Sequence, residues 1–211
     1  QKIEAIKALF IKAMTKTGST RPVYISFDEW ASGFGNNITV SLMVAQHLNS
    51  FIRHADIVRM ANMTMLSNLV GQSPEGVYKN ATFRAFWLYS NNCFGTSLDV
   101  STSCEEYSNK IFSEIPYLDV TAVLNSEAGN VVINVVNRHE TKAIETDIIL
   151  QTGNYAGNAK VNEVNGKITD PGNSRAEEAV NSTSSEIRFK GNIIKYSFPA
   201  HSFTQIMIPF K

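Results

Sequence analysis

Apolar residues in the first part of the chain alternate between helical spacing and short continuous runs. Ile3, Ile6 and Phe10 lie three and four residues apart, which predicts a helix with one apolar face. Residues 23–27 and 57–61 are short runs rich in β-forming side chains, which predicts two buried strands. Patterns of both kinds in succession are typical of α/β structure.

Two further helices are predicted, one between these strands and one after them. Their apolar faces are formed by Val40, Val44, Leu48 and Phe51 in the first and by Phe83, Phe86 and Trp87 in the second. Thr39 is the predicted N-cap of the first, and a loop is expected around 71–76. The order helix, strand, helix, strand, helix predicts parallel pairing. Because two parallel strands are too few for a stable sheet, we expect residues 1–96 to be the end of a larger α/β domain.

From about residue 97 onward the pattern changes to short strands separated by turns. The predicted strands are 118–125, 131–136, 144–150, 187–189, 193–196 and 203–208. Short strands of this kind predict an antiparallel β-sandwich over residues 97–211. We therefore expect an α/β part followed by an all-β part.

Three local expectations follow for the sandwich. Residues 144–150 are predicted to pair with the neighbouring run 131–136. Gly191-Asn192 lies between two strands and predicts a hairpin. The segment 162–185 is polar and contains Gly166, Pro171 and Gly172, so we expect a loop there.

Charge and composition exclude several classes of partner. The 211-residue chain has 19 basic and 19 acidic side chains, whereas nucleic-acid and membrane-surface binders carry basic excess. No run reaches the ~18 apolar residues of a membrane span. We therefore expect neither a nucleic-acid nor a membrane partner. Charged residues are only 18 % of the chain, and Ser, Thr and Asn are plentiful. This favours an extracytoplasmic location, periplasmic or secreted, over a cytoplasmic one.

Cysteines and histidines give no sign of a metal or redox centre. Cys93 and Cys104 lack CxxC spacing, and free thiols are preferred over a disulfide across the ten-residue gap. The four histidines are scattered without HxxxH or HExxH spacing. We expect no metal site and no cofactor.

One short segment points to chemistry. Phe27-Asp28-Glu29-Trp30 places two carboxylates and an indole at the C-terminal end of a predicted parallel strand, where α/β barrels build active sites. An ionised Glu can attack an anomeric carbon, and a Trp face can pack on a sugar ring. The alternative interpretation is a charge pair at the strand end with Trp30 in the core.

Longer stretches of the chain resemble glycoside hydrolase family 51, the α-L-arabinofuranosidases. The resemblance covers essentially the whole sequence in one order. Its segments are 21–30, 44–56, 58–62, 80–83, 115–122, 135–138 and 198–203.

The resemblance implies a fold and a nucleophile. It implies the C-terminal part of a (β/α)8 TIM barrel in residues 1–96, with strand seven in 23–30 and strand eight in 57–64, followed by a jelly-roll sandwich in 97–211. It also implies that Glu29 is the catalytic nucleophile of a retaining mechanism and that Trp30 lines the sugar subsite. No catalytic role is implied for Asp28.

Two departures from the family pattern matter. A retaining mechanism needs a second carboxyl as general acid and base. The family supplies it from an Asn-Glu pair earlier in the barrel, and no such pair precedes Glu29 here. Where many members have Gln on strand eight, this sequence has Met65. We therefore expect this chain alone to be inactive.

The predicted function is that of a C-terminal portion of an α-L-arabinofuranosidase acting on arabinose-containing oligo- or polysaccharides of plants. A homo-oligomer of the full-length enzyme is expected. The alternatives are an endo-β-glucanase or xylosidase of the same family, a carbohydrate-binding sandwich with a platform of Tyr117, Tyr155 and Tyr196, and a structural or interaction protein.

Overall fold

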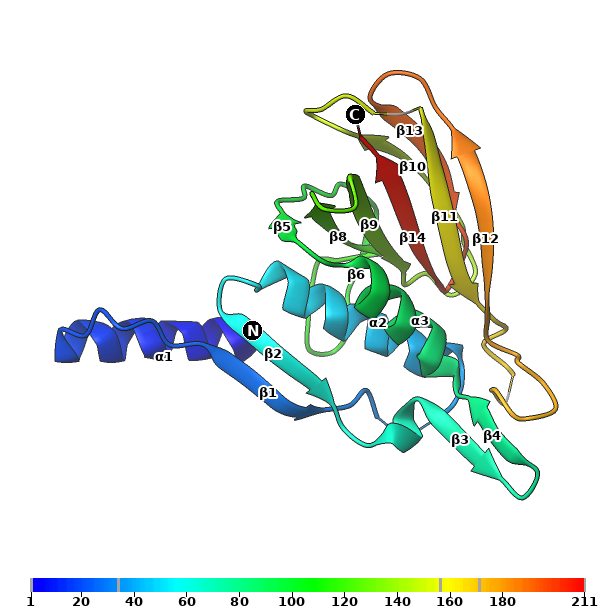
Figure 1. Ribbon diagram of the computed structural model, residues 1–211, viewed down its shortest axis with the longest axis horizontal. Helices are drawn as coiled ribbons and strands as arrows, with labels where there is room; N and C mark the ends of the chain where they lie inside the picture. The colour runs from blue at the N-terminus through cyan, green and yellow to red at the C-terminus, as the bar shows by residue number, and fades with distance from the viewer. Residues whose placement is uncertain (1, 34, 156, 171, 211) are drawn as a thin grey trace.

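A computed structural model describes residues 2–33, 35–155, 157–170 and 172–210 (Figure 1). The first part contains α1 (Lys2–Thr17), β1 (Ile25–Trp30), α2 (Ile38–Arg53), β2 (Val58–Met63), η1 (Leu66–Asn68), β3 (Val70–Ser73), β4 (Gly76–Lys79) and α3 (Ala81–Asn92). The three predicted helices and two predicted strands occur in the predicted order, with η1, β3 and β4 in addition between β2 and α3. No helix of the described residues is long and apolar enough to cross a bilayer.

The two strands of this part pair in parallel, as predicted. Ile25 lies opposite Val58, and Phe27 lies opposite Ala61. The register shifts between Phe27 and Trp30, where β1 bulges. β1 also starts and ends later than the predicted run, so the two acidic residues lie within the strand rather than after it.

Two local predictions in this part were wrong. The N-cap of α2 is Asn37 rather than Thr39, because the Asn37 side chain accepts a hydrogen bond from the Val40 N–H at 3.2 Å. The stretch expected to be a loop contains the antiparallel hairpin β3–β4. Its strands have four residues each, which is too short for an alternating pattern to stand out.

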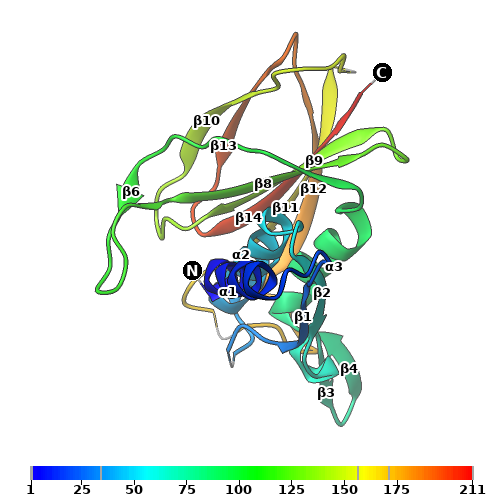
Figure 2. The same ribbon diagram turned by 90° about the vertical axis from the view of Figure 1, so that its left-hand side faces the viewer.

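The second part is a β-sandwich of unequal sheets. The strands are β5 (Thr96–Leu98), β6 (Glu106–Tyr107), β7 (Ile115–Pro116), β8 (Leu118–Asn125), β9 (Asn130–Asn137), β10 (Ile144–Ile149), β11 (Asn158–Asn165), β12 (Asn181–Arg188), β13 (Ile193–Phe198) and β14 (Ser202–Pro209). Six form one sheet in the order β12-β11-β14-β9-β8-β5, and β10 pairs with β13. Figure 2 shows the two layers from the side. The predicted sandwich is confirmed, whereas the described residues hold only two parallel strands of the α/β kind.

Three local predictions for the sandwich differ from the structure. β10 pairs with β13 rather than β9, which lies between β8 and β14. An antiparallel bridge between Lys190 and Ile193 closes the Gly191-Asn192 turn, but the turn joins strands of different sheets, because β12 pairs with β11 and β13 with β10. The expected polar loop contains the second half of β11 and most of β12, and its Pro171 lies outside the described residues. β12 is polar and mostly exposed because an edge strand needs only backbone pairing on one side.

Both faces of the six-stranded sheet are covered. One face packs on β10 and β13 through residues such as Val135, Ile206 and Phe198. The other face packs on α2 and α3, where Val136 and Phe203 join the helix residues in one core cluster. Consecutive residues such as Val135 and Val136 serve opposite faces because strand side chains alternate. The helices of the first part are therefore also the second cover of the sandwich sheet.

Candidate active site

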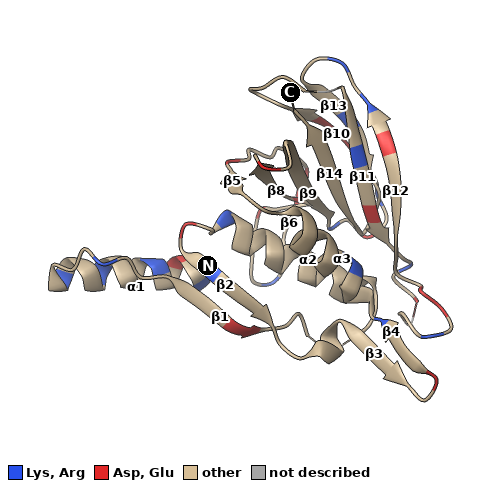
Figure 3. Cartoon of the chain, viewed as in Figure 1, with Lys and Arg blue, Asp and Glu red and all other residues tan. Residues whose placement is uncertain are grey.

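The acidic pair lies on an exposed part of β1. Asp28 and Glu29 are both exposed, and the end of the strand appears as an acidic segment in Figure 3. The Ser26 hydroxyl donates a hydrogen bond to Asp28. Among the described residues Glu29 makes no ion pair. Glu29 is thus an available carboxylate, whereas Asp28 is held by its own strand.

Trp30 is packed between the strand and the helices. Its ring centroid lies 5.3 Å from that of Phe51, 5.7 Å from His47 and 6.4 Å from Phe86, and the residue is 8 % exposed. The Trp30 indole N–H has no hydrogen-bond partner among the described residues. These contacts correspond to the core interpretation of Trp30, and its contact with sugar stays a prediction.

The strand bulge and the strand ends shape this edge. Phe27 also contacts Phe51, with ring centroids 5.2 Å apart, because the bulge between Phe27 and Trp30 interrupts the alternation of side chains. The Thr64 N–H donates to the Trp30 carbonyl at 2.8 Å, so the end of β2 lies beside the end of β1. This edge is formed by the C-terminal ends of both strands, the end at which α/β barrels build their active sites.

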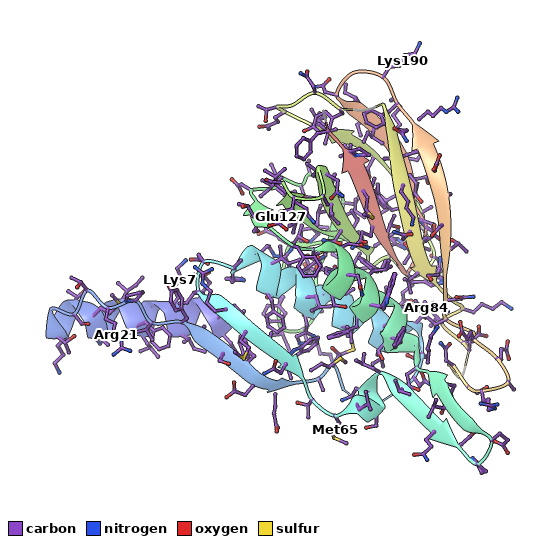
Figure 4. The ribbon with its side chains drawn as sticks, viewed as in Figure 1. Lys7, Arg21, Met65, Arg84, Glu127 and Lys190 are labelled. Atoms are coloured by element: carbon purple, nitrogen blue, oxygen red, sulfur yellow. The ribbon has the colours of Figure 1, made fainter. Side chains whose placement is uncertain are left out.

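Met65 lies two residues after the end of β2. Its backbone φ is +59°, and the residue is 68 % exposed. Figure 4 shows its side chain pointing away from the body of the molecule. A thioether lacks the two N–H donors of a Gln amide, so Met65 does not replace the amide that the resemblance leads one to expect there.

The described residues do not complete a catalytic pair. They contain no cluster of three or more His, Cys, Asp or Glu side chains suited to a metal ion. One Asn-Glu dipeptide occurs downstream, at Asn162-Glu163 on β11 of the sandwich. The Asn162 amide oxygen accepts a hydrogen bond from Ser184 on the neighbouring β12, at 2.6 Å. Burial raises the pKa of the Tyr196 hydroxyl to about 12, and the neighbouring Glu163 carboxylate adds to this rise. This dipeptide therefore belongs to the sandwich and not to the strand end that carries Glu29.

The three tyrosines of the carbohydrate-binding alternative lie apart from one another in the ring contacts of the sandwich. Tyr117 stacks between Tyr107 and His139, with centroids 4.9 and 4.6 Å away, and Tyr196 packs on Phe198. No ring pair of the described residues joins Tyr117, Tyr155 and Tyr196 into a platform. Both cysteines are free thiols, as preferred from the sequence.

Sequence reasoning missed a group of asparagines, of which Asn49, Asn134 and Asn173 are buried and Asn36 is half-buried. Asn36, Asn49, Asn134 and Asn173 each bond residues far away in the chain. Side-chain amides that bond distant polar groups leave no periodic pattern, so no signal in the sequence could have revealed them.

A Glu at the C-terminal end of a parallel strand, followed by a β-sandwich, is the arrangement that the resemblance to glycoside hydrolase family 51 implies. The family model of the α-L-arabinofuranosidase C-terminal domain matches residues 28–202. The chain belongs to this family, and the resemblance to glycoside hydrolase family 51 is confirmed.

Relatives support this assignment. The probable α-L-arabinofuranosidase C of Aspergillus clavatus is 31 % identical over 96 % of this chain and 43 % of the relative. The intracellular exo-α-(1→5)-L-arabinofuranosidase of Halalkalibacterium halodurans is 28 % identical over 67 % of this chain and 33 % of the relative. The chain thus spans less than half the length of these curated relatives.

Solved structures have the same fold. An arabinofuranosidase crystal structure gives a TM-score of 0.84 at 19 % identity, covering 98 % of this chain and 47 % of the other. The arabinose complex of the Thermotoga maritima α-L-arabinofuranosidase gives 0.77 at 21 % identity, covering 88 % and 43 %. A bifunctional glucanase-xylanase, CelM2, gives 0.63 at 18 % identity, covering 95 % and 33 %.

Proposed function

We propose that this chain is the C-terminal part of a longer retaining α-L-arabinofuranosidase, which removes terminal arabinofuranosyl residues from plant oligo- and polysaccharides. Family membership and the names of the relatives support this activity. In this proposal residues 1–96 end a (β/α)8 barrel, β1 and β2 are its strands seven and eight, and residues 97–211 form a jelly-roll sandwich. The parallel pairing of β1 with β2 supports the barrel assignment.

In the proposed reaction the Glu29 carboxylate attacks the anomeric carbon, and a covalent bond forms between them. The bond to the leaving oxygen breaks with its electron pair, and a second carboxyl protonates that oxygen. The same carboxyl then takes a proton from water, whose oxygen attacks the anomeric carbon and releases Glu29. The observation that carries the proposal is the exposed Glu29 at the end of β1, inside a family match that begins at residue 28.

The general acid and base would come from residues N-terminal to this chain. No carboxyl of the described residues is placed as its partner, so the 211-residue chain by itself is expected to be inactive. Trp30 is expected to line the subsite that binds the sugar. The buried Trp30 indole N–H has no hydrogen-bond partner among the described residues. This supports a sugar subsite that further residues of the full-length enzyme complete.

The test is an assay of the full-length enzyme on an aryl arabinofuranoside. Glu29→Gln is expected to lower kcat by at least about 1,000-fold, because the amide cannot act as a nucleophile. Asp28→Asn is the matched control, and it should keep kcat near the parent value. The purified 211-residue chain should give no turnover. Normal activity of the Glu29→Gln enzyme, or turnover by the chain alone that this mutation abolishes, would contradict the proposal.

The alternative substrate class is a β-glucan or xyloside. The likeness to a glucanase-xylanase structure concerns the fold alone. The same full-length enzyme assayed on aryl xylosides and soluble β-glucans decides between them, since an arabinofuranosidase should prefer the arabinofuranoside.

Location and assembly complete the proposal. We propose a periplasmic or secreted enzyme that forms homo-oligomers. Two bacterial relatives have "intracellular" in their names, which concerns those proteins. Cell fractionation and light scattering of the full-length enzyme test the two statements.

A further inference from the structure

The connection between β11 and β12 extends from the sandwich to the loops that follow the parallel strands. In Figure 1 it descends below these two strands toward β4 and α3. The Asn173 N–H donates to the Asn36 carbonyl at 3.0 Å, and the Asn36 side-chain amide donates to the Asn173 carbonyl. Asn36 lies in the β1–α2 loop, seven residues after Glu29. We call this reciprocal pair the Asn36–Asn173 latch.

Both side chains of the latch reach further elements. The Asn36 side-chain oxygen accepts from the N–H of Ala81, the first residue of α3, at 2.6 Å. Asn173 is only 4 % exposed, and its amide donates to the Lys79 carbonyl at the end of β4, at 3.2 Å. The Val180 N–H donates to the Asn173 side-chain oxygen at 2.7 Å. One pair of residues therefore joins the sandwich, the β1–α2 loop and the junction of β4 with α3.

Close backbone approach at the latch requires glycine. Gly172 has a φ of +107°, and a Cβ atom there would lie 1.3 Å from the Asn36 carbonyl oxygen. Any side chain at this position must push the two loops apart. Nearby, Arg84 of α3 forms an ion pair with Glu178 of the same connection at 2.8 Å, and Figure 4 shows Arg84 below the sandwich.

We propose that the latch positions the catalytic carboxylate. By fixing Asn36, the sandwich holds the β1–α2 loop, and this loop fixes the end of β1 that carries Glu29. Asn36, Gly172 and Asn173 are positioning residues, which act through the loop and do not touch the substrate. The inference rests on the proposed function of Glu29. It assigns the sandwich a part in catalysis in addition to packing.

The experiment compares two glycine variants of the full-length enzyme. Gly172→Ala inserts a Cβ into the latch. Gly191→Ala is the matched control, because Gly191 also has a positive φ, +68°, but open space around it. We expect faster hydrogen exchange of the β1–α2 loop in Gly172→Ala only. We also expect kcat to fall about 10- to 100-fold in this variant, because displacement of a reacting group by ~1 Å has an effect of that size.

A second pair of variants covers the case in which Gly172→Ala does not fold. Asn36→Ala removes both hydrogen bonds of the Asn36 side chain, the one to the Asn173 carbonyl in the latch and the one from the Ala81 N–H. Asn125→Ala, which removes a turn bond to the Ala128 N–H, is its control. Asn36→Ala is expected to raise loop exchange and lower kcat, with KM changed less than kcat. Asn125→Ala should change neither.

The outcomes are separable. Unchanged loop exchange in the latch variants overturns the proposal, whatever the activity. Faster loop exchange with kcat equal to that of the control also overturns it, because the latch would then be structural only. If the parent enzyme does not cleave arabinofuranosides, or Glu29→Gln keeps full activity, the proposed function fails. The positioning role then fails with it, and loop exchange still decides whether the latch holds the β1–α2 loop.

Discussion

At the residue scale, burial shifts the pKa of the Cys93 thiol. Cys93 ends α3, and its sulfur contacts the Asn134 and Gln205 side chains beneath the sandwich sheet. Burial raises the pKa of the Cys93 thiol to about 12, and the Asn134 amide only partly offsets this rise. A raised pKa favours the neutral thiol, whereas the nucleophile in alkylation is the thiolate.

Alkylation of Cys93 should therefore be slow in the folded chain. We expect little labelling by iodoacetamide between pH 7 and pH 10, where the folded pKa leaves almost no thiolate. In urea the pKa returns to about 8.5, and labelling should become fast above pH 8. Peptide mass spectrometry measures both, with the denatured chain as the control. Labelling of Cys93 at equal rates in both states would contradict the prediction. Because the folded chain binds the thiol proton more tightly than the unfolded chain does, Cys93 contributes to the free energy of unfolding below about pH 9. This contribution is lost as the pH rises toward 12.

At the scale of elements, the buried carboxylate of Asp119 joins helix α2 to the sandwich sheet. Asp119 of β8 is 4 % exposed and forms ion pairs with Arg53 at the end of α2, at 2.6 Å, and with Arg138, just after β9, at 2.9 Å. The Asn49 amide of α2 also donates to the Asp119 carbonyl at 3.0 Å. The junction of α2 with the sheet thus depends on groups that are costly to leave unpaired.

Asp119→Ala should lower the free energy of unfolding by about 3 kcal/mol, because Arg138 keeps its charge in a mostly buried site without a carboxylate. The control is Asp147→Ala. Its ion pair with Lys195 is 3.3 Å long, with side chains 53 % and 83 % exposed. This control should change stability by less than about 1 kcal/mol. Urea unfolding followed by circular dichroism measures both. Equal effects of the two substitutions would show that the buried pair does not hold the junction.

The whole molecule is built around one sheet with two different covers. β10 and β13 cover one face, and α2 and α3 cover the other (Figure 2). Tyr89 of α3 stacks on Phe203 of β14 with ring centroids 4.9 Å apart. The predicted boundary at 96/97 therefore separates two sequence patterns that share one hydrophobic core.

Residues 97–211 alone should be less stable than the full chain. Removing both helices exposes Val136, Val164 and Phe203, which are fully buried. Exposure of each costs about 1.5–3 kcal/mol, so we expect a melting temperature at least ~10 °C lower. Residues 36–211, which retain both helices, are the control and should melt close to the full chain. Calorimetry decides, and equal melting of 97–211 and the full chain would mean that the helices do not stabilise the sheet.

Particular residues show how far the sequence alone could lead. The apolar spacing of Ile3, Ile6 and Phe10 predicted α1, and the runs before Trp30 and after Ile57 predicted the parallel pair. Long apolar strands such as β9 and β14 were also predicted. The polar strand β12 was missed because backbone hydrogen bonds to β11 form it, and these leave no trace in side-chain polarity. Glu29 was singled out by its neighbours in the chain.

The sequence by itself determined the three helices, the parallel strand pair, the apolar strands of the sandwich, the change of pattern near residue 97 and the acidic segment of β1, because these depend on neighbouring residues. Only the tertiary structure decided that β10 pairs with β13, that α2 and α3 cover the sandwich sheet, and that Asn173 meets Asn36. These contacts join residues far apart in the chain. They are selected by shape, burial and the need to satisfy buried polar groups, and no local pattern encodes that selection.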